Sequence, residues 1–300
     1  MSGLLDKFKP NNITELSKNN EDILEKNIVW LFASPRSGTQ WIGTKLLKYQ
    51  TIINRGPSIG LNLGSIHTGF EKKIVRQIEY RGDEPDYCLS KKYEKTWMHF
   101  IRKLILNRLY AQYGTLETII VIPDPEGSIA CDIIAKCMPN SKLIILFRDG
   151  RDVTDSVIDA AKEGSWFVKS RGVDPLSSEQ QTKRVKRVSL RWTRQVELLQ
   201  TAFNTHPTDL RYKLRYEDIH ANTLSELKKI YDFIGIDILQ DELEKVVQKH
   251  SFENIPSNQK GSGKVTRSAS PGQWKKNFSE EEQKIMQDIM GKTLSDLGYS

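Results

Sequence analysis

The sequence predicts one α/β domain in which helices cover both faces of a parallel β-sheet. Short apolar stretches rich in β-branched residues recur along the chain, and a polar loop joins each of them to an amphipathic stretch. An apolar run of about six residues is typical of a strand buried on both faces. Strands that alternate with helices form parallel sheets, because a parallel pair needs a crossover connection between its strands.

The first predicted strand is Ile28–Ala33, and the polar loop 34–39 joins it to a helix that starts near Trp41. The same order then repeats along the chain. Further strands are predicted at 118–122, 142–147 and 211–216, and further helices at 128–137, 152–161, 180–203, 223–234 and after Ser279.

Capping residues and apolar spacing support the predicted helices. In 180–203 the apolar residues recur every three or four positions, as on one face of an amphipathic helix. Gly235 is suited to a left-handed C-cap after 223–234. Ser279, with Glu282 three residues later, forms a capping box at the start of the last helix.

Three stretches, 54–69, 163–178 and 256–272, lack both patterns and are rich in Gly, Ser, Pro or Lys. Loops of this kind at strand ends build the ligand sites of α/β proteins. The polar residues 1–26 are predicted to form an N-terminal arm ahead of a domain that spans 27–300.

Composition and charge narrow the class of protein. The 45 Lys and Arg residues against 38 Asp and Glu residues give a formal charge of +7. This excess favours anionic ligands without choosing among nucleotides, nucleic acids and membrane surfaces. The arm lacks the apolar core of a signal peptide, and the longest apolar runs fall far short of the roughly 20 residues that cross a bilayer. Three cysteines without metal-site spacing favour a reducing compartment, so we expect a cytoplasmic location.

The loop 34–39 is the first candidate anion site. It joins a buried strand to a helix start, where backbone N–H groups lack intrahelical partners and the helix dipole is positive. Arg36 supplies a planar cation suited to phosphate or sulfate oxygens. The Lys-Ser/Thr pair of a Walker A motif is missing after Gly38. The alternative is an ordinary turn with an exposed arginine.

The segment 148–153 is the second candidate anion site. It follows the predicted strand 142–147, and Ser156 lies one turn into the next helix. An arginine at a strand end and a hydroxyl in the first helical turn can bind one phosphate together. The alternative is a helix start stabilised by ion pairs.

Together with two later segments, these loops resemble the sulfotransferases that use 3′-phosphoadenosine 5′-phosphosulfate (PAPS). Residues 36–39 with Trp41 are similar to the family's 5′-phosphosulfate loop, and residues 148–153 with Ser156 are similar to its 3′-phosphate motif. Residues 215–218 match its R-Y-E-D turn, and 272–274 resemble the G-x-W of its C-terminal cofactor loop. The first loop carries Arg36 where the animal cytosolic members have Lys. The resemblance spans residues 28–299 in the correct order.

The resemblance implies a P-loop-NTPase-like sulfotransferase fold and in-line transfer of a sulfuryl group from PAPS to a hydroxyl or amine, with release of adenosine 3′,5′-bisphosphate. It implies no metal, no specific nucleic acid and no membrane partner. The acceptor would be a small molecule, a lipid or a saccharide, and the oligomeric state stays open. The implied cofactor-binding residues are Arg36, Ser37, Gly38, Thr39, Gln40, Trp41, Arg148, Ser156, Tyr216, Arg267, Ser268 and Ala269. The last two replace the Lys and Gly of the animal cytosolic members.

Sulfuryl transfer needs a cation at the leaving oxygen and a base for the acceptor proton. Arg36 suits the first task. Asp124, at the position where the animal cytosolic enzymes have a catalytic His, is one candidate base, and His67 in the first irregular stretch is another. His99 and Glu126 are further options. Asp124 is equally well interpreted as a turn residue between two prolines.

Two other functions stay open. A nucleotide- or nucleic-acid-binding protein without chemistry would suit the +7 charge and the basic residues of 180–203. A P-loop-type kinase is disfavoured by the missing Walker lysine. Two separate phosphate sites at strand ends favour a mononucleotide with two separated phosphates. The basic residues of 180–203 are interpreted as a solvated face, with an acidic acceptor as the alternative.

Overall fold

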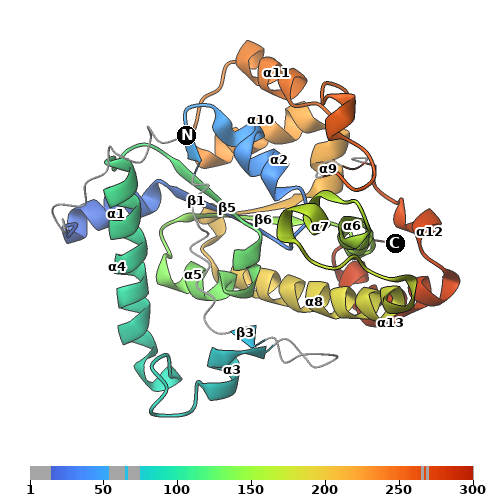
Figure 1. Ribbon diagram of the computed structural model, residues 1–300. Coiled ribbons are helices and arrows are strands. Elements are labelled where there is room, and N and C mark those ends of the chain that lie inside the picture. Colours follow the sequence, from blue (N-terminus) through green and yellow to red (C-terminus); the bar gives the residue numbers. More distant parts are fainter. Residues whose placement is uncertain (1–14, 54–64, 67–74, 265–266, 268–269, 300) are drawn as a thin grey trace.

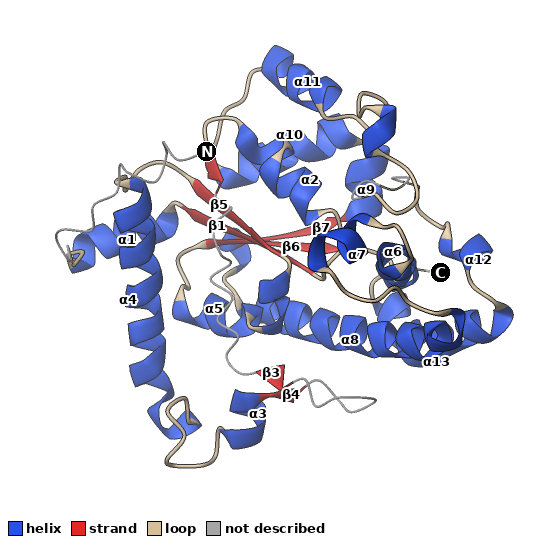
Figure 2. Cartoon of the chain, in the orientation of Figure 1, coloured by secondary structure: helices blue, strands red, loops and turns tan. Residues whose placement is uncertain are grey.

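The structure is a computed structural model that describes residues 15–53, 65–66, 75–264, 267 and 270–299. Its centre is a five-stranded parallel sheet with the strand order β2, β5, β1, β6, β7 (Figures 1 and 2). These strands are β1 (Ile28–Ala33), β2 (Ile52–Ile53), β5 (Ile120–Asp124), β6 (Lys142–Phe147) and β7 (Arg211–Arg215). A separate antiparallel pair consists of β3 (Ser65–Ile66) and β4 (Val75–Arg76).

Helices make up most of the rest of the described chain. The α-helices are α1 (Lys18–Lys26), α2 (Thr39–Thr44), α3 (Gln77–Arg81), α4 (Glu94–Tyr113), α5 (Cys131–Cys137), α6 (Gly150–Ala161), α7 (Trp166–Arg171), α8 (Ser178–Thr205), α9 (Tyr216–Ala221), α10 (Thr223–Ile234), α11 (Gln240–Lys249), α12 (Trp274–Asn277) and α13 (Glu280–Asp296). The short 3₁₀ helices are η1 (Leu46–Lys48), η2 (Lys91–Tyr93), η3 (Glu126–Ile129), η4 (Thr208–Leu210) and η5 (Ser257–Gln259).

Helices cover both faces of the sheet, because its central strands are apolar on both sides. Trp30 and Phe32 of β1 belong to a core that includes α4, α5, α8 and α13. Val29 and Leu31 belong to the opposite core, with α2, α10 and α11. In Figure 1, α2, α10 and α11 lie above the sheet, and α5, α8 and α13 lie below it. The predicted α/β class, with helices on both faces of a parallel sheet, is confirmed.

The register of the strands brings their carboxyl ends to one edge of the sheet. Phe32 pairs with Asp124, and Ala33 pairs with Leu146. The end of β7 pairs with the end of β6. The loops that follow β1, β5, β6 and β7 therefore begin side by side, at the edge where open α/β sheets bind their ligands.

The strand predictions agree closely with the structure. The strands at 28–33 and 142–147 have the predicted bounds, and the strand predicted at 118–122 is shifted to 120–124. Tyr216, predicted to end the last strand, instead begins α9, because the chain bends after Arg215 to place the R-Y-E-D turn on the sheet edge.

The predicted caps are also present. Ser279 and Glu282 make both hydrogen bonds of the capping box at the start of α13. Gly235 has a φ of 86° as the C-cap of α10. The long amphipathic helix is Ser178–Thr205, slightly longer than predicted.

Two parts of the prediction differ from the structure. The helix predicted at 128–137 begins as η3 and continues as α5, with a break at Ala130. The stretch 163–178, expected to be irregular, contains α7, which Ser165 caps by accepting a hydrogen bond from the Val168 N–H. Most of the irregular stretch 54–69 lies outside the described residues.

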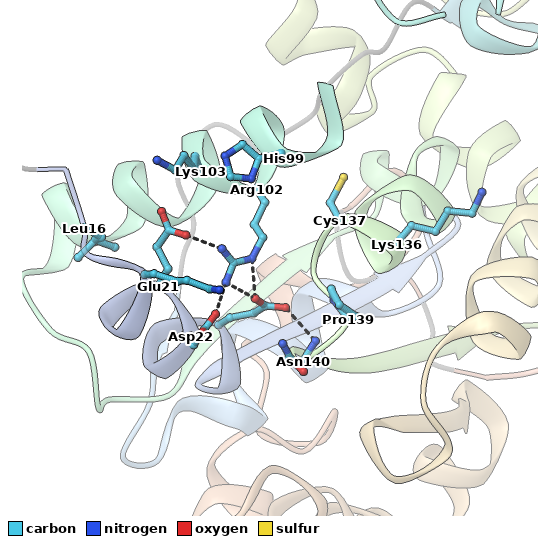
Figure 3. Close-up of a pocket in the computed structure, with 12 residues that line it drawn as sticks. Leu16, Glu21, Asp22, His99, Arg102, Lys103, Lys136, Cys137, Pro139 and Asn140 are labelled. Carbon is cyan, nitrogen blue, oxygen red and sulfur yellow. Dashed lines mark hydrogen bonds and ion pairs between the residues drawn. The ribbon is translucent and has the colours of Figure 1, made fainter. Parts of the chain in front are cut away.

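The described part of the predicted N-terminal arm is packed onto the domain. Leu24 of α1 is fully buried in the core beneath α4. Arg102 of α4 donates hydrogen bonds to Glu21, Asp22 and Glu25 of α1 at 2.5–2.8 Å (Figure 3). The predicted boundary after residue 26 therefore does not separate an arm from the domain, because α1 shares the core of the sheet that follows it.

The cysteines are free thiols with two different environments. Cys131 and Cys137 are buried, and burial raises the pKa of Cys137 to about 12, so this thiol stays protonated near neutral pH. Cys88 is exposed. Within the described ranges, no helix combines the length and the apolar character that a membrane crossing requires.

We expect Arg102→Ala to lower the free energy of unfolding by about 3–5 kcal/mol, because it leaves two buried carboxylates without their cation. Glu25 is fully buried and Glu21 is 3% exposed. Urea unfolding followed by circular dichroism measures the loss. Arg108→Ala is the matched control, since Arg108 lies exposed on the same helix and donates a hydrogen bond to the neutral side chain of Gln112. Equal losses in the two variants would contradict a buried ionic contact.

Candidate anion-binding site

The loop after β1 has an unusual backbone, with two left-handed residues two positions apart. Arg36 has a φ of 70°, which is uncommon for a residue other than glycine, and Gly38 has a φ of 93°. The hydroxyls of Ser34 and Ser37 lie 2.8 Å apart inside the loop. A Cβ on Gly38 would lie 2.7 Å from the ring of Tyr216, so only glycine fits both the φ and the space.

Arg36 connects the two predicted anion motifs. Its Nε donates a hydrogen bond to Ser156 Oγ of α6 at 3.0 Å. Its carbonyl accepts a hydrogen bond of 2.7 Å from Arg148 Nη1 at the end of β6. Its guanidinium lies 5.6 Å from the ring centre of Trp166 in α7, within the range of a cation–π interaction. The first loop and the 3′-phosphate motif therefore form one site.

Positive charge is concentrated in this site. Burial lowers the pKa of Arg36, the charges of Arg148 and Arg267 lower it further, and Asp159 opposes them. These like charges disfavour the cationic form of Arg36, so an approaching anion would stabilise it. The arrangement suits a ligand that carries more than one negative charge.

Among the described residues, buried donors at the ends of β1 and β6 lack a hydrogen-bond partner. Thr39 is 3% exposed and its Oγ1 has no partner, and the buried Nε of Arg148 has none either. Buried polar atoms are almost always satisfied, so orphaned ones at a ligand edge indicate a missing acceptor. Both can donate, and they therefore fit phosphate or sulfate oxygens.

The aromatic residues of the site have packing roles. Tyr216 is 6% exposed and its ring lies 4.3 Å from the Arg148 guanidinium carbon. Trp41 meets the edge of Tyr216 at 6.2 Å between ring centres and donates from Nε1 to the carbonyl of His250. Both rings therefore support the loop by packing. Gln40 is exposed beside them.

The R-Y-E-D turn ties the end of β6 to the C-terminal residues. Glu217 accepts hydrogen bonds from the Asp149 N–H at 3.1 Å and from the Tyr299 hydroxyl at 2.8 Å. The Arg215 guanidinium lies 4.4 Å from the centre of the Tyr299 ring. This turn fixes the backbone next to Arg148.

Asp124 lies at the same sheet edge, with its carboxylate engaged locally. It is 2% exposed, and its Oδ1 accepts a 2.8 Å hydrogen bond from the Gly127 N–H. It is in register with Phe32, so both side chains lie on the face of the sheet that α5, α8 and α13 cover. Asp124 therefore stabilises the turn, as one of its two interpretations predicts. This contact does not conflict with the other interpretation, in which Asp124 is a base.

Of the other candidate bases, His99 lies away from this edge. His99 of α4 lines a cavity of about 610 Å³ together with Glu21, Arg102 and Asn140, and Asn140 precedes β6, at the amino edge of the sheet (Figure 3). Ion pairs between α1 and α4 occupy this region, so it is not a candidate active site. Glu126 belongs to η3 beside Asp124. His67 lies outside the described residues, as do Ser268 and Ala269 of the implied cofactor set.

Sequence reasoning missed Trp166 and the acidic residues of α6 as parts of the site. Trp166 lies in a stretch interpreted as irregular, although Ser165 before it is a good N-cap signal. Asp155 and Asp159 are buried in α6 and contact the C-terminal segment. Their spacing could have indicated one helix face, but nothing in the local sequence shows what covers that face.

We expect Gly38→Ala to destabilise the protein by about 1–3 kcal/mol, because it combines a left-handed φ with the Tyr216 contact. Gly172→Ala is the matched control, since Gly172 has a φ of 60° and open space around it. Urea midpoints measure both losses. If the two variants lose the same stability, the Tyr216 ring must yield at no cost and the close approach is unimportant.

Comparison with known proteins places this geometry in a family. The family model described as "Sulfotransferase domain" matches residues 133–298. The mouse sulfotransferase SULT7A1 complexed with PAP has a similar structure, with a TM-score of 0.56 and 15% identity over 95% of this chain and 92% of that one. The sulfotransferase STF9 from Mycobacterium avium gives a TM-score of 0.52 with 12% identity over 91% and 77%.

A curated relative, described as "Flavonol sulfotransferase-like" from Flaveria bidentis, is 30% identical over 101 residues, or 28% of this chain. The match spans about a third of that relative, 33% of its length. The two structural similarities support the fold, and the family match covers more than half of the chain, including the second anion motif and the C-terminal segment. The chain belongs to the sulfotransferase domain family.

Proposed function

We propose that this chain transfers a sulfuryl group from PAPS to a hydroxyl or amine acceptor and releases adenosine 3′,5′-bisphosphate. The observation that carries the proposal is the direct contact between the two anion motifs, through Arg36, Ser156 and Arg148. A ligand with two separated anionic groups matches two motifs joined in this way. Family membership supports the same reaction, as does the PAP in the related mouse structure.

The chain's own residues fit such a ligand. Residues of the first loop would hold the 5′-phosphosulfate, with the orphaned Thr39 hydroxyl as one donor. Arg148, Ser156 and Arg267 would hold the 3′-phosphate. When bound, PAPS supplies an activated sulfuryl group that requires no metal. The remaining members of the implied set, Ser268 and Ala269, stay predictions from the resemblance.

Arg36 would stabilise the charge that develops on the leaving phosphate oxygen. Ser156 and the Trp166 ring fix the position of its guanidinium before any ligand binds. A donor that needs no reorganisation stabilises a transition state better than a mobile one. The buried surroundings strengthen this effect, because water does not screen the charge.

Asp124 would accept the proton that the acceptor loses. Its place at the end of β5, next to β1, puts it on the ligand edge of the sheet. The Gly127 N–H holds one carboxylate oxygen and so fixes the orientation of the group. We propose a small molecule, a lipid or a saccharide as the acceptor, and a cytoplasmic location on the grounds of cysteine usage.

Nucleotide-dependent melting distinguishes the proposal from its alternatives. We expect adenosine 3′,5′-bisphosphate to raise the melting temperature by several degrees at 100 times its Kd, where binding contributes about 2.7 kcal/mol. ATP carries a comparable charge but lacks the 3′-phosphate, so it should stabilise less. A larger shift with ATP would favour a kinase or a nonspecific anion binder and would sink the proposed cofactor.

We expect Asp124→Asn to lower kcat by on the order of 10² or more while the affinity for adenosine 3′,5′-bisphosphate is kept. Asparagine retains an oxygen for the Gly127 N–H but cannot accept a proton at neutral pH. Turnover is measured with labelled PAPS after a screen of phenols, sugars and lipids has provided an acceptor. If Asp124→Asn stays active and His67→Gln does not, His67 is the base and Asp124 is a turn residue.

A further inference from the structure

Helix α6 carries three buried carboxylates on one face. Asp152, Asp155 and Asp159 are spaced three and four residues apart, which places them in one stripe along the helix. They are 1%, 3% and 6% exposed. Buried carboxylates are costly unless they are paired or hydrogen-bonded, so such a stripe needs a partner surface.

The partner surface is the C-terminal segment between Ser262 and Asn277. Asp159 accepts hydrogen bonds from Ser262 Oγ at 2.7 Å and from the Gly263 N–H at 2.9 Å. Asp152 accepts one from the Gly272 N–H at 2.8 Å. These contacts involve only neutral donors, so they attach the segment without using its charge.

Asp155, in the middle of the stripe, differs from its neighbours because its partner is charged. It forms an ion pair with Arg267 and accepts hydrogen bonds of 3.0 Å from Asn277 Nδ2. The side chains of Arg267 and Asp155 are 13% and 4% exposed. An ion pair this buried holds the guanidinium in one place, since any other position would leave a buried charge unpaired.

The ion pair with Asp155 gives Arg267 a partner that the sequence alone does not indicate. A lone arginine in a segment rich in Gly, Ser and Lys would need a bound anion to order it. Here a protein carboxylate orders it, and that carboxylate directly precedes Ser156, the hydroxyl of the 3′-phosphate motif. The ion pair engages Nη2 of Arg267, and the guanidinium has other N–H donors for a ligand.

We propose that Asp155 is a positioning residue that holds Arg267 beside Ser156, so that the 3′-phosphate of the nucleotide enters a subsite already assembled. Preorganisation of this kind increases affinity because the side chain is ordered before binding. The inference rests on the proposed function, because it assigns Arg267 to the 3′-phosphate of the same ligand.

The experiment isolates the 3′-phosphate by comparing two probes. Isothermal titration gives the Kd of adenosine 5′-monophosphate and of adenosine 3′,5′-bisphosphate, and the ratio of the two measures what the 3′-phosphate contributes. We expect Asp155→Asn to reduce this ratio about tenfold, through weaker binding of the bisphosphate alone, which is the size of one charge-assisted hydrogen bond. A ratio that is unchanged or increased overturns the inference, and an increase would mean that Asp155 competes with the phosphate for Arg267.

Asp159→Asn is the matched control, because it alters a buried acid of the same helix that contacts the same segment through neutral donors. Its ratio should fall clearly less than that of Asp155→Asn, because Asp159 acts on Arg267 through its charge alone and its hydrogen bonds go to Ser262 and Gly263. An equal fall in this variant would show that general attachment of the segment, rather than Arg267, is responsible, and would overturn the inference.

The double variant D155N/R267Q completes the test. Since Asp155 acts only through Arg267, the double variant should give the same ratio as R267Q alone. The double variant also removes both buried charges together, so it remains informative if Asp155→Asn does not fold. A ratio lower than that of R267Q alone overturns the inference. If the wild-type protein binds both probes equally, the proposed cofactor fails, and this inference fails with it.

Discussion

The hydrogen bond from the Arg148 guanidinium to the carbonyl of Arg36 joins the ends of two neighbouring strands, and the candidate site depends on it. Because Arg36 is left-handed, its carbonyl turns toward β6 while its side chain extends to Ser156 on α6. A charge-assisted hydrogen bond of this type contributes about 1.5–3 kcal/mol, enough to hold a strained backbone. This contact therefore holds the loop backbone, while Ser156 and the Trp166 ring position the Arg36 guanidinium.

Charge balance explains how such a site can exist in a folded protein without its ligand. Burial lowers the pKa of Arg36, and the charges of Arg148 and Arg267 lower it further. Three carboxylates of α6 offset these positive charges. Burial lowers the pKa of Arg267, but Asp155, Asp159 and Asp152 raise it by more. The acids lie on the helix face that the C-terminal segment covers, so they compensate the arginines while the guanidiniums keep donors for an anion.

The sequence predicted the sheet well, because its strands are local signals. The strand at 28–33 ends where an apolar run meets a proline and an arginine, and 142–147 ends in the same abrupt way. The motif at 148–153 was likewise recognisable from residue types at fixed spacing. Its position beside the first loop followed from the expectation that parallel strands end at one edge.

The partners of these residues could not be predicted, because they depend on contacts across most of the chain. Arg267 and Asp155 are 112 residues apart, and Arg36 and Ser156 are 120 apart. No spacing rule relates such positions, so the pairing of Arg267 with a protein acid was unforeseen. The sequence could not assign the base for a related reason. Asp124 lies at the carboxyl edge of the sheet and can accept a proton, but the same carboxylate also stabilises a turn.

The contact between Tyr299 and Glu217 links the last described residue of the chain to the sheet edge that carries the candidate anion site. Glu217 bonds the backbone next to Arg148, and the Tyr299 hydroxyl bonds Glu217 in turn. Tyr299 is 8% exposed, and its pKa is raised by burial and by the charge of Glu217, so its hydroxyl remains a donor throughout the physiological range. An affinity tag or fusion partner attached directly behind this tyrosine would pull on the turn that supports the phosphate motif, whereas a long flexible spacer would leave it in place.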